Sequence, residues 1–267
     1  MIDQGKHNVL GVNIDAVDYD AAVHRVMLAA ERSEPMTVSA LAVHGLMTGV
    51  MDEEHRYRLN KFDLLCPDGQ PVRWALGWLH RAKLPDRVYG PNLMLKLCER
   101  AAATGTPIFL LGGSEELLAD LSAKLCEQFP ELNIAGARAS KFRTLTPEER
   151  QEMIDEVRAS GARMTFIGLG CPRQEVFAYE MREALGMPLL AVGAAFNFHA
   201  KQLSQAPQWM QDRGLEWLYR LGKEPRRLWR RYLMLNPMYL TLLGMQAVGL
   251  RNRPAGGERP THEVCYG

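Results

Sequence analysis

Short apolar segments rich in β-forming residues alternate along the chain with longer segments of helical periodicity, and this alternation constrains the fold most. Proline at a first turn predicts helices from Pro71 and Pro91, Gly105 predicts a helix stop, and Thr146 with Glu149 forms a capping-box pattern. The β-α-β-α order predicts an α/β fold, with a mostly parallel, Rossmann-like sheet flanked by helices. Strands are predicted at 37–43, 62–65, 107–111, 133–137, 164–168 and 188–192.

Composition excludes several classes of protein. Hydrophobic residues make up 47% of the chain and charged residues 24%, so a sizeable core is possible and a disordered chain is not expected. The net charge of +1 argues against a nucleic-acid partner. The five cysteines have no CxxC spacing and the seven histidines no zinc-ligand spacing, which favours a reducing compartment over a disulfide framework or a zinc knuckle. The first fifteen residues contain no apolar run, so no cleaved secretory signal is expected.

The composition changes after about residue 205. Between Asp212 and Arg231 there are seven basic residues against three acidic ones, with tryptophans and tyrosines interleaved. We therefore expect a catalytic α/β domain at 1–205 and a basic, aromatic, helical appendage at 206–250 that associates with membranes. The segment 251–267 is rich in Gly, Pro and charge, and a disordered tail is expected there.

Ligands of open α/β sheets bind outside the carboxyl ends of the strands, where this sequence places glycine-rich loops. Gly lets a backbone approach a ligand and helix N-termini attract anions, so a nucleotide or a diphosphate is a candidate ligand. The alternative is that these are ordinary turns. The dinucleotide fingerprint is incomplete, because Arg173 stands where its third glycine would be. The loops contain Gly112, Gly113, Gly168 to Glu175, and Gly193 to Asn197.

Two carboxylates stand at predicted strand ends or helix starts. Asp68 follows an apolar run and precedes Gly69, so it is a candidate general base, or else a turn residue or helix N-cap. Gln174 and Glu175 lie just inside a predicted helix. Either one can bind ligand, although Glu175 can equally be a surface charge that compensates the helix dipole.

Two basic side chains are further candidates. His44 follows the first predicted strand and can contact a substrate hydroxyl or phosphate, or act as a structural hydrogen bonder. Arg87 precedes the predicted helix at Pro91 and can pair with a phosphate, or be an ordinary surface arginine.

A series of motifs over residues 9–231 resembles the WecG/TagA/CpsF family of glycosyltransferases. Their identity and order carry this resemblance. The motifs are Cys66-Pro67-Asp68-Gly69, Arg87-Val88-Tyr89-Gly90, Phe109 to Gly113, Gly168 to Glu175, Ala206-Pro207, Gly214 to Arg220, and Glu224 to Arg227.

The resemblance implies an inverting transferase that moves an N-acetylmannosamine-type or related N-acetylhexosamine from a UDP-sugar to a polyprenyl-diphosphate-linked acceptor sugar. It implies Asp68 as the base, with Arg87 and Gln174 in the active site. The threonine of the family's TxN segment corresponds to Ser39, which keeps a hydroxyl. The asparagine of that segment corresponds to Leu41, and the aspartate of the family's FD pair to Asn197, so both positions depart from the pattern.

The resemblance also implies that C-terminal arginines close the site over the diphosphate. Arg220, Arg226, Arg227 and Arg230 are the candidates, and basic residues together with interfacial aromatics favour an anionic membrane surface. The uncharged run 232–250, broken at Pro237, is expected to lie in that interface. We therefore expect a peripheral enzyme on the cytoplasmic face of the inner membrane. Packing of this helix on a neighbouring protomer is the alternative, and a homo-oligomer stays open.

Neither an essential metal nor another cofactor is expected, since the family resemblance suggests none. Two other functions remain to be weighed. One is a Rossmann-type nucleotide-dependent oxidoreductase. The other is a non-catalytic scaffold that docks on lipid through its C-terminal segment.

Overall fold

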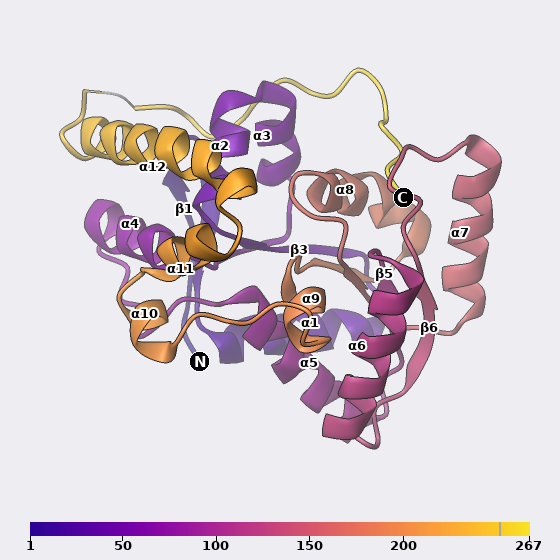
Figure 1. The fold of residues 1–267 in the computed structure, drawn as a ribbon. Coiled ribbons are helices and arrows are strands. Elements are labelled where there is room, and N and C mark those ends of the chain that lie inside the picture. Colours follow the sequence, from indigo (N-terminus) through magenta and orange to yellow (C-terminus); the bar gives the residue numbers. More distant parts are fainter. Residues whose placement is uncertain (251) are drawn as a thin grey trace.

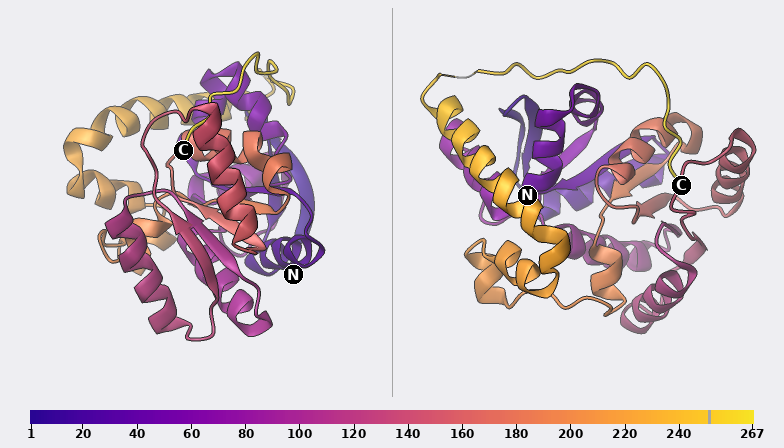
Figure 2. Two further views of the ribbon diagram at one scale, coloured as in Figure 1. Left: turned by 90° about the vertical axis from the view of Figure 1, so that its right-hand side faces the viewer. Right: turned by 45° about the horizontal axis from the view of Figure 1, so that its top comes forward.

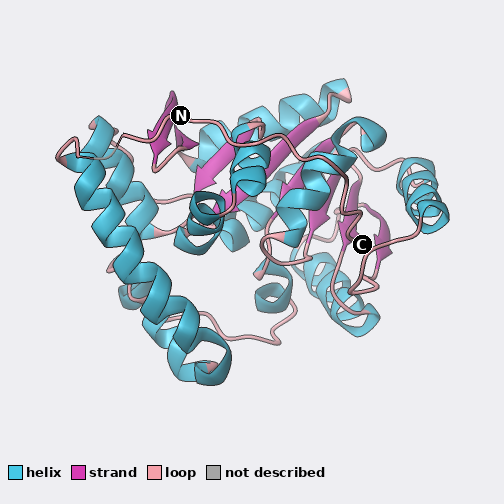
Figure 3. Cartoon of the chain, turned by 90° about the horizontal axis from the view of Figure 1, so that it is seen from above, coloured by secondary structure: helices cyan, strands magenta, loops and turns pink. Residues whose placement is uncertain are grey.

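A six-stranded parallel sheet forms the centre of the molecule (Figure 3). The computed structural model describes residues 1–250 and 252–267, apart from the side chains of Arg227, Arg230 and Arg231. The strand order is β4-β3-β8-β7-β5-β6, so the predicted fold class is confirmed. The strands are β3 (Met36–Leu41), β4 (Leu64–Pro67), β5 (Ile108–Leu111), β6 (Ile134–Arg138), β7 (Met164–Ile167) and β8 (Pro188–Ala191).

Helices cover both faces of this sheet (Figure 1). Alternate side chains of a strand point to opposite faces. In β5, Phe109 and Leu111 therefore enter one core cluster, and Ile108 and Leu110 enter the other. The first cluster lies under α2 (Val43–Met51), α3 (Glu53–Asn60), α4 (Gln70–His80), α7 (Pro147–Ala159) and α8 (Arg173–Leu185). The second lies under α1 (Tyr19–Arg32), α5 (Gly90–Thr104), α6 (Glu115–Gln128) and α9 (Ala195–His199).

Local signals in the sequence account for several of these boundaries. The Thr146 side chain and Glu149 form the predicted capping box at the start of α7, and Gly105 ends α5 with a φ of 66°. Elements near the N-terminus were not predicted: these are α1 and an antiparallel hairpin of β1 (Asp3–Val9) and β2 (Val12–Val17). Most side chains of β1 are exposed, so this strand lacks the apolar alternation that reveals a strand.

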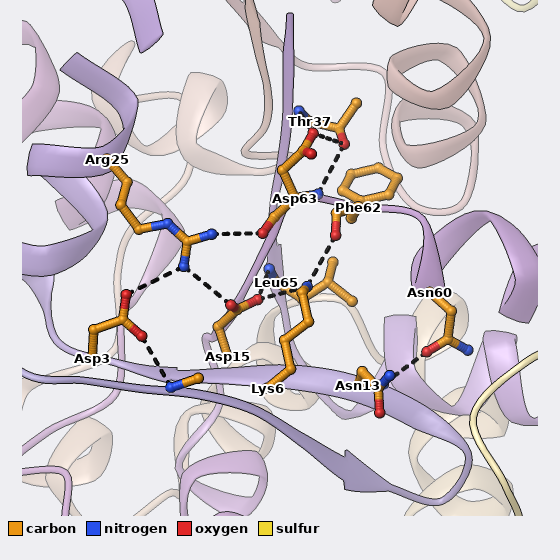
Figure 4. Close-up of polar contacts among 11 residues, drawn as sticks. Asp3, Lys6, Asn13, Asp15, Arg25, Thr37, Asn60, Phe62, Asp63 and Leu65 are labelled. Carbon is orange, nitrogen blue, oxygen red and sulfur yellow. Dashed lines mark hydrogen bonds and ion pairs between the residues drawn. The ribbon is translucent and has the colours of Figure 1, made fainter. Parts of the chain in front are cut away.

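A buried carboxylate fastens the hairpin to the edge of the sheet (Figure 4). Asp15 on β2 is 1% exposed, and it pairs with Lys6 at 2.9 Å and with Arg25 at 3.1 Å. It also accepts a hydrogen bond from the Leu65 backbone N–H of β4 at 2.8 Å. This network therefore joins β1, β2 and α1 to β4, the strand that directly precedes Asp68.

The segment after residue 205 is helical, as expected. It contains α10 (Gln208–Asp212), α11 (Glu216–Lys223) and α12 (Pro225–Ala247). The expected break at Pro237 is wrong, because α12 continues through it. The helix packs against α2 and α4, and the Tyr239 hydroxyl donates to the Pro71 carbonyl at 2.8 Å, so tertiary contacts offset the cost of an internal proline. Among the described residues, no helix is both long enough and apolar enough to cross a bilayer.

Residues 252–267 cross the molecule from α12 to the vicinity of α7 (Figure 2). The Arg253 guanidinium donates to the Val50 carbonyl at 2.7 Å, and Glu180 on α8 accepts from the Val264 and Cys265 amides. Thr144 forms a β-bridge with Tyr266. The disordered tail that the composition predicts is therefore not what the structure shows for these residues. Backbone amides of the tail bond to groups of the folded domain, and composition does not report such partners.

We predict that Asp15→Ala destabilises the fold by about 2 kcal/mol, because it leaves the Leu65 amide and two cations without their shared acceptor. Lys6 and Arg25 keep about a third of their surface in water, which limits the loss. Asp15→Asn keeps an acceptor and should cost less. Urea unfolding measures both variants, and a stability unchanged in Asp15→Ala would contradict this role for the network.

Candidate active site

Asp68 lies at the carboxyl end of β4, where the strand turns into α4. Its Oδ2 accepts a hydrogen bond from the Gly90 amide at 3.0 Å, and its own amide donates to the Leu41 carbonyl of β3 at 3.3 Å. Gly69, not Asp68, is the N-cap residue of α4. The helix-capping interpretation of Asp68 is therefore wrong, and its carboxylate is directed to the start of α5.

The surroundings of Asp68 favour a base that works near neutral pH. Burial raises the pKa of its carboxyl to about 6, with the Arg87 charge lowering this pKa and the Glu216 charge raising it further. The Gly90 amide and Arg220 lower it again. A carboxylate with this pKa is mostly ionised at pH 7 and still holds a proton more readily than an ordinary aspartate.

Arg87 is buried rather than on the surface, with only 6% of the residue exposed. Its guanidinium pairs with Glu216 at 2.8 Å, donates to Gln211 Oε1 at 3.0 Å and lies 4.2 Å from the centre of the Tyr89 ring. Burial lowers the pKa of Arg87, but Asp68 and Glu216 reverse this and raise it overall, so the side chain stays charged. The interpretation as an ordinary surface arginine is wrong.

A cavity of about 410 Å³ opens beside this group, between the sheet edge and the C-terminal helices. Gly69 and Arg87 both line it, so the cavity adjoins Asp68. Two other candidates, His44 and Arg220, line it as well. Its walls are largely aromatic and aliphatic, with Trp74, Trp78, Trp217, Tyr232, Leu235, Tyr239 and Leu240 among them.

A second group of candidates lies at the carboxyl ends of β3 and β7. Ser39 is fully buried and donates to Glu175 Oε1 at 3.0 Å, while Gln174 Nε2 donates to the same oxygen at 2.9 Å. Glu175 is 1% exposed, so its interpretation as a surface charge is wrong. Burial raises the pKa of Glu175, whereas Gln174 and Ser39 lower it in part. None of these three residues lines the 410 Å³ cavity.

The candidate glycines permit close packing behind this second group. A Cβ on Gly112, whose φ is 113°, would lie 2.7 Å from the backbone of Gly168. A Cβ on Gly193 would lie 3.3 Å from Gln174 Oε1. Gly113 has a φ of 74° and precedes Ser114, which caps α6. These glycines therefore have packing and conformational roles that do not depend on a ligand.

The remaining candidates are spread more widely. Asn197 is half-buried on α9, and Arg226 is exposed at the start of α12. The side chains of Arg227 and Arg230 lie outside the described residues. Arg220 on α11 lies 5.9 Å from the ring centre of Phe198. Arg220 also lies close enough to Asp68 to lower the pKa of that carboxyl.

Glu216 and Tyr89 were not selected from the sequence, although both stand within the motifs. Glu216 begins α11 and joins Arg87 and Tyr89, whose hydroxyl donates to Glu216 Oε1 at 2.9 Å. In the sequence, Glu216 was only one of the three acidic residues counted between Asp212 and Arg231. A pairing between positions this far apart in the chain leaves no local signal.

Comparison with known families agrees with this geometry. The model of a family described as "Glycosyl transferase WecG/TagA/CpsF family" matches residues 7–253. The match includes the strand end at Asp68, the pair of Arg87 and Glu216, and all three C-terminal helices. The chain therefore belongs to the WecG/TagA/CpsF family of glycosyltransferases.

Proposed function

We propose that this chain, a glycosyltransferase of cell-surface polysaccharide synthesis, moves an N-acetylmannosamine-type or related N-acetylhexosamine. The donor is a UDP-sugar, and the acceptor is a sugar linked to polyprenyl diphosphate. The observation that carries the proposal is the Asp68 carboxylate, which is bound to the Gly90 amide beside a largely apolar cavity and has a pKa raised to about 6.

Asp68 acts as the general base in this proposal. It takes the proton from the attacking hydroxyl of the acceptor while that oxygen forms a bond to the anomeric carbon of the donor. The bond from this carbon to the UDP oxygen breaks on the opposite face, so the configuration inverts. One carboxylate suffices for such a displacement, because no covalent intermediate has to be formed.

Cationic side chains beside Asp68 stabilise the negative charge that develops on the departing UDP. Arg87 and Arg220 both lie close enough to Asp68 to lower its pKa. Glu216 already pairs with Arg87, so a diphosphate that binds there has to share or replace this carboxylate. We assign Gln174 and Ser39, with Glu175 between them, to shaping the donor side of the site. The chemistry is proposed to need no metal or other cofactor.

The apolar walls of the 410 Å³ cavity suit the lipid-linked acceptor. Trp78 on α4, Trp229 and Leu233 on α12 and Leu218 on α11 are large apolar side chains that remain exposed nearby. Exposed apolar groups next to basic residues favour a membrane interface. We therefore propose peripheral binding to an anionic membrane, on the cytoplasmic face of the inner membrane, through α11 and α12.

Membership of a transferase family sets aside the oxidoreductase interpretation, which the incomplete glycine fingerprint had already weakened. A purely structural lipid-docking protein would not require a base at residue 68. The two interpretations that remain differ in whether Asp68 is needed for turnover.

The function is tested by measuring UDP release from a panel of UDP-sugars with a short-chain lipid-diphosphate acceptor. We expect release with at least one UDP-N-acetylhexosamine, and only when acceptor is present. No release with any N-acetylhexosamine donor would contradict the proposed substrate class.

Asp68→Asn should lower kcat by at least about 10²-fold, the smaller end of a typical general-base contribution, while UDP still binds. Asp155→Asn on the exposed surface of α7 changes a carboxylate in the same way and should leave kcat unchanged. UDP release gives kcat, and calorimetry gives the affinity for UDP. Near-normal turnover of Asp68→Asn would remove this residue from the mechanism.

Arg226→Ala should weaken binding to vesicles that contain anionic lipid, because each basic residue near such a surface contributes about 1 kcal/mol. This corresponds to about a fivefold change in the partition constant, and added salt should reduce it. Arg158→Ala on α7 removes an exposed charge on the far side of the molecule from α12 and serves as the control (Figure 1). Equal loss of binding in both variants would argue against docking through α12.

A further inference from the structure

Three side chains with metal-binding atoms meet at the start of α8. They are His55 on α3, Cys171 in the loop after β7, and Glu175 in the first turn of α8. One ring nitrogen, the Sγ atom and one carboxylate oxygen all lie within 4.8 Å of one another. Since α3 and α8 are far apart in the chain, only the fold brings these residues together.

His55 is the unexplained member of the group. It is 2% exposed, and neither ring nitrogen has a hydrogen-bond partner among the residues that the structure describes. A buried polar group left without a partner costs about 1–3 kcal/mol and calls for an ion or a water. A neutral imidazole ring has one nitrogen with a free lone pair, which can bind a metal ion.

Glu175 is held in an orientation that suits a ligand. Its Oε1 atom accepts hydrogen bonds from Ser39 and Gln174, which leaves Oε2 for a further partner. Hydrogen bonds of this kind commonly orient the carboxylates that bind metals. The Cys171 thiol interacts with the same carboxyl group, and Cys171 is only partly buried, so the cluster is reachable from solvent.

We propose that His55, Cys171 and Glu175 bind a zinc ion. Zinc prefers nitrogen, thiolate and carboxylate ligands, whereas magnesium and calcium prefer oxygen alone. Water completes a tetrahedron in this site. On binding, the thiol loses its proton to solvent, and the thiolate and the carboxylate together balance the two positive charges of the ion. The nearby Arg58 cation pairs with Glu54 at 3.3 Å.

The role of this ion is structural and does not depend on the proposed transfer reaction. It connects α3 to the first turn of α8 and thereby fixes the helical turn that carries Gln174 and Glu175. The chemistry assigned to Asp68 takes place at the end of another strand, β4, and uses no metal. Loss of zinc should therefore lower thermal stability, and any change in turnover would follow from the altered position of the first turn of α8.

The first test uses the unmodified chain, purified under reducing conditions and stripped of metal with a chelator. Added zinc should bind at about one equivalent per chain by mass spectrometry and raise the unfolding temperature. Cobalt in place of zinc should produce a thiolate-to-metal charge-transfer absorption. Failure to bind either metal at stoichiometric concentration, or cobalt binding without the thiolate band, would overturn the proposal.

Variants assign the ligands. Cys171→Ser and His55→Gln should each lose the bound zinc and its thermal stabilisation, and Cys171→Ser should lose the charge-transfer band. Cys126→Ser replaces an exposed cysteine on α6 and should retain all three signals. Circular dichroism reports whether each variant is folded. Zinc retained in folded Cys171→Ser and His55→Gln would overturn the assignment, and the cobalt band of the unmodified chain still tests the thiolate if a variant does not fold.

Discussion

The buried ion pair of Arg87 with Glu216, close enough to Asp68 to affect the pKa of its carboxyl, is the interaction on which the site depends. A buried cation is tolerated only when anions and hydrogen-bond acceptors surround it, and here they come from both parts of the chain. Asp68 ends a strand of the sheet, whereas Glu216 and Gln211 belong to the C-terminal helices. The same pairing therefore closes the helical segment over the sheet edge and sets the charge around the proposed base.

The proposed zinc ion stabilises a second point at the same edge of the sheet. Ser39, Gln174 and Glu175 form a hydrogen-bonded group at the ends of β3 and β7, and His55 lies beside it. Asp68 and the hydrogen-bonded residues around Glu175 thus lie at the same edge of the sheet, beside the ends of the neighbouring strands β4 and β3. A rigid position for both is what a displacement with two substrates requires, because the reacting atoms have to be aligned.

Much of the fold and part of the candidate site could be predicted from the sequence, because the signals come from residues that are neighbours in the chain. Strand ends, glycine stops and the capping box at Thr146 depend on neighbours in the chain. The motif around Asp68 supplied the candidate base, which stays a prediction. The hairpin could not be predicted because its outer strand is polar and is held by a buried Asp15 network. The burial of Arg87 and Glu175, the role of Glu216 and the order of the tail all depend on contacts between distant segments, which no local pattern records.

The measurement that tests the account most directly is the acidic limb of the pH profile of kcat/KM, in the wild type and in Glu216→Gln. The negative charge of Glu216 raises the pKa of Asp68, and the base works only when deprotonated, so wild-type activity should fall as the pH drops through about 6. Removal of this charge should move the limb to lower pH. Glu131→Gln on the remote surface should leave it in place. A limb that stays unchanged or moves upward in Glu216→Gln would contradict the assignment of Asp68 as the base.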